Sequence, residues 1–221
     1  MRNWPKTIAI ASLAMVLTAS VVLAFPKPSV YPVSWQYKFD YNKPKRIAVR
    51  TPGDAAAQGY WYMTFTLTNK DIDDPSVRFL PIFELLTREG KIIRSDKEVP
   101  PNVYEEISRR EGHKLEPLDK IRGKILMGED QARDGVCVWP EPAPRMGTFS
   151  IFFSGLSGET IYLDKEGKLV DTKDWTKISE DEKKAFISLR KTLEVTYTIP
   201  GDEMYPGEDA VNFVKQEWLM R

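Results

Sequence analysis

Residues 60–69 constrain the fold more than any other stretch, because their side chains alternate strictly in character. Every second residue is large and apolar, and these residues are Trp61, Met63, Phe65 and Leu67. The residues between them are two tyrosines and then three threonines. A period of two in aromatic and β-branched residues is typical of a strand with one buried face. Such a face needs a second layer to cover it, so the segment predicts a β-sandwich.

The same alternation recurs along the chain, most clearly at residues 33–41 and 192–199. We expect further strands at residues 45–50, 79–86, 92–93, 120–127, 135–139, 149–153, 161–163 and 168–170. Residues 211–219 form either a terminal strand or a short helix, because their pattern fits both. The expected fold is therefore mainly β, an immunoglobulin-like antiparallel β-sandwich with one or two short peripheral helices.

Two segments change to a helical period. Residues 103–112 place acids four residues before bases, in Glu105 with Arg109 and Glu106 with Arg110, and they end at Gly112. This predicts a short helix lying across an end of the sandwich. Ser179 and the glutamate three residues later form a capping-box pattern, which predicts a second helix over residues 180–189.

The N-terminal segment, residues 1–24, has the pattern of a signal peptide or a membrane anchor. Arg2 and Lys6 precede an uncharged, mostly apolar run from Thr7 to Phe25. Cleavage as a signal peptide and retention as an anchor both place the remaining chain outside the cytoplasm, in the periplasm or cell envelope. A Pro-rich leader at residues 25–32 then precedes one predicted domain at residues 33–221.

The charges and the single cysteine narrow the function classes. The chain carries 32 basic and 32 acidic residues, so it offers no electrostatic reason to bind nucleic acid or an anionic membrane surface. Cys137 is the one cysteine, so an internal disulfide is impossible. Because Cys137 stands between two valines, we expect it to be a buried small hydrophobe.

The residues needed for common catalytic sites are scarce. His113 is the one histidine and follows a glycine in a charged loop, where we expect a solvated residue. The serines and glycines at residues 154–158 lack the spacing of a nucleophile elbow, and one histidine with one cysteine cannot build a closed zinc site. We predict no catalytic, cofactor-binding or metal-binding residue and no cofactor, and we do not expect an enzyme.

Acidic clusters leave two alternatives open. Asp71, Asp73 and Asp74 resemble the start of a calcium loop, but Ser76 and Ile82 stand where that loop needs glycine and glutamate. Looser groups of acids occur at Glu129, Asp130, Asp134, Asp202, Glu203, Glu208 and Asp209. Solvated turn carboxylates explain all of them, while a carboxylate-based hydrolase remains an alternative because carboxylate separation is a three-dimensional property.

Aromatic residues suggest a different alternative. Trp35, Trp61 and Trp139 fall on predicted core faces. Tyr60 and Tyr62 fall on the opposite face of their strand, where exposed rings could stack on sugars. A carbohydrate-binding module using Tyr60 and Tyr62 is therefore the second functional prediction.

Several segments together resemble an uncharacterised family of exported proteins from planctomycete-type bacteria. The resemblance rests on residues 60–64, 79–85, 128–130, 135–136, 155–157, 191–193 and 217–221. It implies export and a β-rich domain, but no activity or site residue. The Gly128-Glu129-Asp130 loop followed by Gly135-Val136 is also similar to extracellular immunoglobulin-like domains.

These observations favour one function over the others. We expect a non-enzymatic, exported or membrane-anchored cell-envelope domain that binds another envelope component, either a protein or a glycan. Contact with the membrane is expected through the N-terminal segment alone.

Overall fold

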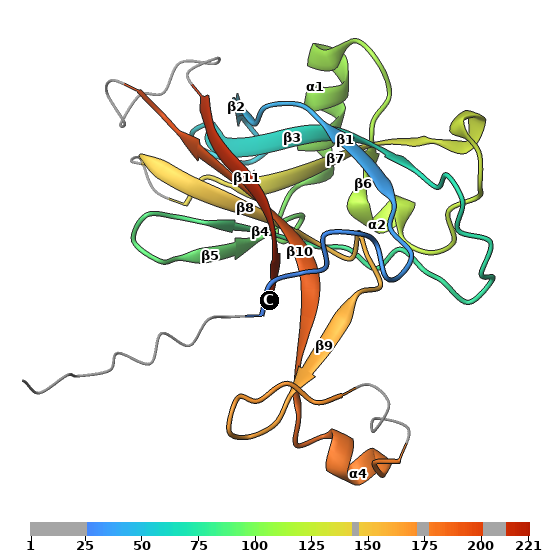
Figure 1. Cartoon of the computed structure of the whole chain (residues 1–221). Coiled ribbons are helices and arrows are strands. Elements are labelled where there is room, and N and C mark those ends of the chain that lie inside the picture. Colours follow the sequence, from blue (N-terminus) through green and yellow to red (C-terminus); the bar gives the residue numbers. More distant parts are fainter. Residues whose placement is uncertain (1–25, 143–145, 172–176, 201–210) are drawn as a thin grey trace, which may run out of the picture.

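The computed structural model describes residues 26–142, 146–171, 177–200 and 211–221 of the 221-residue chain (Figure 1). The predicted signal or anchor segment at residues 1–24 lies outside the described residues. No helix within the described ranges has the length and apolar character needed to span a membrane.

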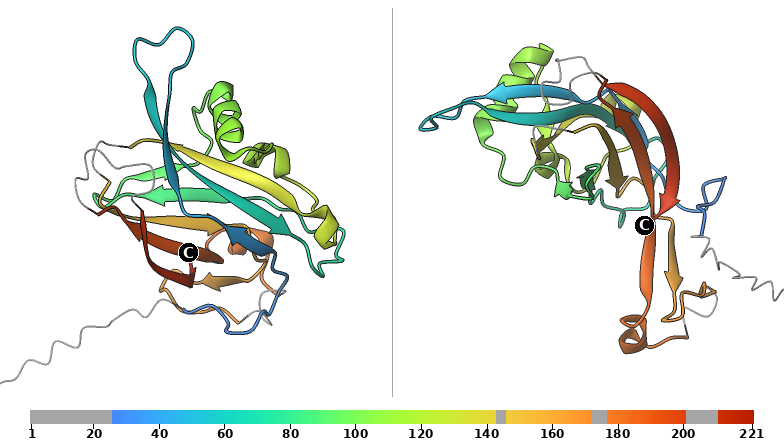
Figure 2. Two further views of the ribbon diagram at one scale, coloured as in Figure 1. Left: turned by 90° about the horizontal axis from the view of Figure 1, so that it is seen from above. Right: turned by 90° about the vertical axis from the view of Figure 1, so that its left-hand side faces the viewer.

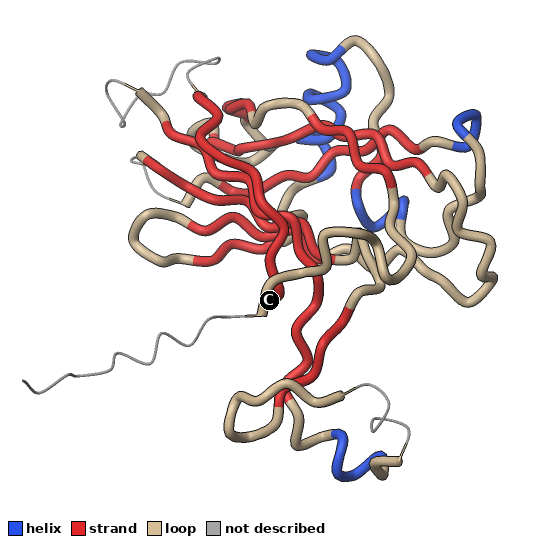
Figure 3. Tube along the Cα trace, viewed as in Figure 1, coloured by secondary structure: helices blue, strands red, loops and turns tan. Residues whose placement is uncertain are grey.

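The protein is mainly β, and its strands form two sheets. The first sheet has the order β1-β3-β7-β6, with β2 also paired to β3, and consists of β1 (Lys38–Tyr41), β2 (Lys45–Val49), β3 (Gln58–Thr68), β6 (Glu116–Pro117) and β7 (Arg133–Pro140). The second has the order β11-β10-β8-β4-β5, with β9 also paired to β10, and consists of β4 (Ile82–Leu86), β5 (Ile92–Arg94), β8 (Thr148–Ser154), β9 (Thr160–Leu163), β10 (Ile187–Thr198) and β11 (Asn212–Met220). All the strand pairs are antiparallel except β6 with β7. Four short helical segments connect or flank them: α1 (Pro101–Glu111), α2 (Leu118–Ile121), η1 (Glu129–Gln131) and α4 (Glu180–Lys183) (Figure 3).

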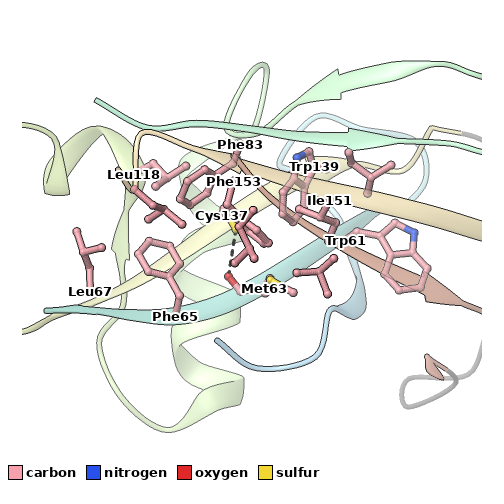
Figure 4. Close-up of a cluster of buried hydrophobic side chains, with 14 of the residues drawn as sticks. Trp61, Met63, Phe65, Leu67, Phe83, Leu118, Cys137, Trp139, Ile151 and Phe153 are labelled. Carbon is pink, nitrogen blue, oxygen red and sulfur yellow. Dashed lines mark hydrogen bonds between the residues drawn. The ribbon is translucent and has the colours of Figure 1, made fainter. Parts of the chain in front are cut away.

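The main core lies between the sheets, where the predicted alternation places it (Figure 4). The apolar residues of β3 are buried there, with Trp61, Met63 and Leu67 fully inaccessible to solvent. Aromatic rings join the two layers: Phe65 lies 5.8 Å from Phe83, and Trp61 lies 5.6 Å from Phe149, between ring centroids. The predicted buried face of β3 is confirmed.

A second buried cluster lies on the outer face of the first sheet. There α1 packs against β2, β3 and β7, through Val103 and Ile107 on the helix. The prediction of a helix over residues 103–112 is confirmed, with Gly112 as its C-cap at φ 77°. Its predicted place at an end of the sandwich is wrong, because a second apolar stripe on the sheet faces outward and α1 covers it.

Other predicted boundaries need correction. Residues 120–127 form no strand: Leu118 and Ile121 face the core from the single turn α2, and Gly123 at φ 116° ends any extended run. The capping box at Ser179 is present, but its helix ends at Lys183 and β10 begins at Ile187. Residues 33–41 are shorter as a strand than predicted, and Val33 is 70% exposed. The tail is strand β11.

Beyond the core, β9 and the first part of β10 extend away from the two sheets and carry α4 at their end (Figure 2). At the base of this extension the Pro-rich leader crosses in front of β10 before joining β1 (Figure 1).

Candidate functional site

The leader is fixed to the second sheet by a buried ion pair. Glu159 lies just before β9 and Lys191 lies on β10; their side chains are 6% and 5% exposed, and Lys191 Nζ is 3.2 Å from Glu159 Oε2. The backbone N–H of Ser29 donates to Glu159 Oε1 at 2.7 Å, and Lys191 Nζ donates to the carbonyl oxygen of Ser29 at 3.5 Å. The pair therefore binds both the backbone N–H and the backbone carbonyl of Ser29 in the leader.

The opposite charges of Glu159 and Lys191, which together form the leader clamp, balance each other. Burial alone would raise the pKa of Glu159, but the hydrogen bonds from Ser29 and Lys191 outweigh it, and the pKa is lowered. Lys191 Nζ also lies 5.3 Å from the ring centroid of Trp218 on β11, within reach of a cation–π attraction. The Glu159 carboxylate thus keeps its charge at neutral pH.

A groove of about 520 Å³ lies between the leader and the end of β11. The last four residues of the strand form one wall, and its remaining lining residues are Pro26, Lys27, Pro28, Ser29, Val30, Pro32, Gln36 and Lys191. The Oε1 atom of Gln36 is buried and has no hydrogen-bond partner among the described residues. An acceptor in that condition is costly unless a donor reaches it.

The strand beside the groove is an edge. β11 pairs with β10 on one side and ends the order of its sheet. Near its start the register shifts and Val214 has no paired residue on β10, and Lys215 follows. Bulges and lysines at an edge strand discourage pairing with a further strand. The half of β11 that remains suited to such pairing is its C-terminal half, which borders the groove.

The structure buries the residues predicted to stack on sugars. Tyr60 and Tyr62 are fully inaccessible to solvent because α1 covers their face of β3. The Tyr62 hydroxyl donates to Glu111 Oε1 at 2.6 Å, and Lys45 Nζ donates to the same carboxylate at 3.0 Å. The prediction of an exposed platform at Tyr60 and Tyr62 is wrong.

The histidine and the cysteine lie where the sequence predicts. His113 is exposed, and its Nδ1 is 3.1 Å from the carbonyl oxygen of Glu111. Cys137 is fully buried, its Sγ donates to the carbonyl oxygen of Met63 at 3.4 Å, and burial raises its pKa.

The acidic clusters form no metal site in the described part of the chain, where no three His, Cys, Asp or Glu side chains are placed to hold an ion. Asp74 instead accepts hydrogen bonds from the backbone and hydroxyl of Ser76 at 2.8 and 2.6 Å, which lower its pKa. Asp134 accepts from the Thr66 hydroxyl at 2.7 Å. Glu129 is 3.8 Å from Lys38 Nζ. Asp202, Glu203, Glu208 and Asp209 lie outside the described residues.

Sequence reasoning missed Glu159, Lys191 and Gln36. Lys191 directly precedes a clear strand pattern. The pattern of a strand does not reveal that one of its lysines pairs with a glutamate far away in the sequence. The one available signal was Gln36, a polar residue between two aromatic positions of an alternating segment.

Comparison of the chain with protein-family models, with curated proteins and with solved structures finds no match.

Proposed function

We propose that this protein is a non-enzymatic cell-envelope module, exported or N-terminally anchored, that binds an extended segment of another envelope component in the leader groove. The module is the domain at residues 33–221, with the leader as one wall of its site. The immunoglobulin-like arrangement of the sandwich is part of this proposal, supported by two mainly antiparallel sheets around one aromatic core.

One observation carries the proposal: the unpaired edge of β11 borders a groove that contains an unused hydrogen-bond acceptor. An extended peptide that adds to a sheet edge gains backbone hydrogen bonds and places alternate side chains in pockets. Trp218 and Leu219 are half-buried beside the groove and provide apolar contacts, and Gln36, whose Oε1 has no hydrogen-bond partner among the described residues, also lines it.

Export is supported by sequence alone, through Arg2, Lys6 and the uncharged run that follows them. In an anchored form the leader would join the membrane-embedded segment directly to the groove. The partner would then be a component close to the membrane surface.

Site-specific photo-crosslinking in intact cells tests the proposal. A photoreactive aromatic residue replaces Glu217, which lines the groove, or Glu166, a matched control in the turn after β9. Each glutamate is exposed and paired with a lysine two residues away, Lys215 and Lys168 respectively. We expect a discrete adduct from position 217 that is lost when Trp218 is replaced by alanine, and no adduct from position 166.

Two results would contradict the proposal. One is equal adduct yield from both positions, which would indicate random collision. The other is substrate turnover by the purified chain that a single carboxylate substitution abolishes.

A further inference from the structure

A second cleft, of about 340 Å³, is formed where the turn after β5 meets α2. Its charged lining residues are Arg94, Asp96, Lys97, Asp119 and Arg122. Pro81, Phe83 and Leu118 supply apolar surface. Cleft and leader groove share no lining residue.

Asp96 is fixed at the cleft by contacts to two elements, β7 and α1. Its backbone N–H donates to the carbonyl oxygen of Val138 on β7 at 2.7 Å. Its Oδ1 accepts from the Tyr104 hydroxyl on α1 at 2.7 Å and from the Val138 N–H at 3.3 Å. Its Oδ2 is buried and has no hydrogen-bond partner among the described residues.

The backbone around this residue is strained. Asp96 and Glu98 have φ of 60° and 58°, and they are the two non-glycine residues with positive φ in the described chain. Residues with a side chain adopt this left-handed conformation at an energetic cost. Lys97 lies between these two residues, is exposed and lines the cleft.

A carboxylate at position 96 is also costly. Burial raises the pKa of Asp96 to about 6, the hydrogen bonds from Tyr104, Ser95 and Val138 offset part of this effect, and the charge of Asp119 adds to it. An asparagine could accept the same two hydrogen bonds at Oδ1 without a buried charge. The contacts therefore explain the position of the side chain and leave its charge unexplained.

Three cationic side chains line the cleft. Arg94, Lys97 and Arg122 are exposed, and none of them has an ion-pair partner among the described residues. Asp96 Oδ1 is directed to Tyr104 and Val138 instead, and Asp119 is the other acid that lines the cleft. Positive charges therefore outnumber negative ones there, and arginine is well suited to bind oxyanions.

We propose that this cleft binds the oxyanion of a small ligand, a phosphate or a carboxylate, between Arg94, Lys97 and Arg122, and that Asp96 tunes its affinity. When Asp96 is neutral the cleft loses a negative charge beside the ligand. For an anion whose own charge is constant over this range, such as a sugar carboxylate, binding is then stronger below about pH 6 than at pH 8.

Calorimetric titration of the purified full chain with inorganic phosphate, D-glucuronate and D-glucose tests the proposal. We expect saturable binding of at least one anion and none of glucose, and the anion that binds identifies the source of the oxyanion. Arg122→Gln should weaken binding by roughly tenfold or more, because a charge-assisted contact is lost. Arg88→Gln, in the β4–β5 turn outside the cleft, should leave the affinity unchanged.

Asp96→Asn gives the sharpest result, since it mimics the neutral acid. Compared with the wild type at the same pH, it should bind the anion more tightly at pH 8 and about equally tightly at pH 5, so that the charge of the anion itself cancels. His113→Gln should keep the wild-type pH dependence, which separates Asp96 from the single histidine. The proposal is wrong if neither anion binds saturably, if folded Arg122→Gln binds normally, or if Asp96→Asn weakens binding.

Discussion

At the scale of single residues, the buried polar groups carry most of the information about function. Asp96 and Gln36 each place a carbonyl-type oxygen in a buried position without a partner among the described residues. Tyr62, by contrast, is fully paired: its hydroxyl reaches Glu111 beneath α1 and stabilises the fold. Residue type alone did not distinguish these cases, because all three occur in similar mixtures of polar and apolar neighbours.

Asp96 should lower the stability of the protein at neutral pH. Its folded pKa of about 6 lies above the ordinary value of 3.8, so the folded state binds the proton more tightly than the unfolded state does. The free energy of unfolding should therefore fall by about 3 kcal/mol in total as the pH rises from about 3 to about 7, and then stay level with respect to this group.

Urea unfolding at several pH values measures this effect, with Asp96→Asn as the comparison. The variant should be more stable than the wild type at pH 7 and nearly equal to it at pH 4. A variant that is less stable at both pH values would show that the carboxylate stabilises the fold.

At the scale of elements, most strands and the helix α1 were predictable along the sequence, and the sheet face on which α1 packs was not. Alternation in β3, β8 and β10 is a local property of the backbone, so the sequence identifies these strands directly. The place of α1 depends on a distant sheet face. Its signal was the run Val136-Cys137-Val138-Trp139, which is apolar on both faces and indicates a strand covered on both sides.

Errors arose where one pattern fits two structures. In residues 120–127, Ile121 and Ile125 alternate with lysines and an arginine as in a strand, yet Leu118 and Ile121 are three residues apart and share one face of a helical turn. The groove was not predictable, because it joins the leader to the last strand of the chain.

The two side chains of the leader clamp, Glu159 and Lys191, should be strongly coupled in their effect on the free energy of unfolding. Glu159→Gln or Lys191→Met alone should each destabilise the protein by about 3–5 kcal/mol, because each leaves a buried charge without its partner. The double variant should be much less destabilised than the sum of the two. Urea unfolding at pH 7 measures all three, and additive losses would mean that the two side chains act independently.

The pH range over which the Glu159–Lys191 pair stabilises the protein follows from the lowered pKa of Glu159. The stabilisation is complete above the ordinary pKa of 4.5 and is lost as the pH falls through the lower folded value.

At the scale of the whole molecule, the two sheets enclose the aromatic core, and the leader groove and the Asp96 cleft lie at their margins. The leader groove uses the edge of the second sheet, and the Asp96 cleft lies where the turn after β5 meets α2. The mainly β character of the fold followed from the sequence, whereas the leader groove and the Asp96 cleft both depend on contacts between segments far apart in the chain.

Pairing at the β11 edge is the central claim, and amide hydrogen exchange tests it most directly. Exchange is compared between the free full chain and the chain crosslinked to its partner through position 217. We predict slower exchange at residues 216–220 and in the leader at residues 26–32, with little change in β3 or β7. Unchanged exchange along β11, or protection confined to the outer face of another strand, would contradict the account.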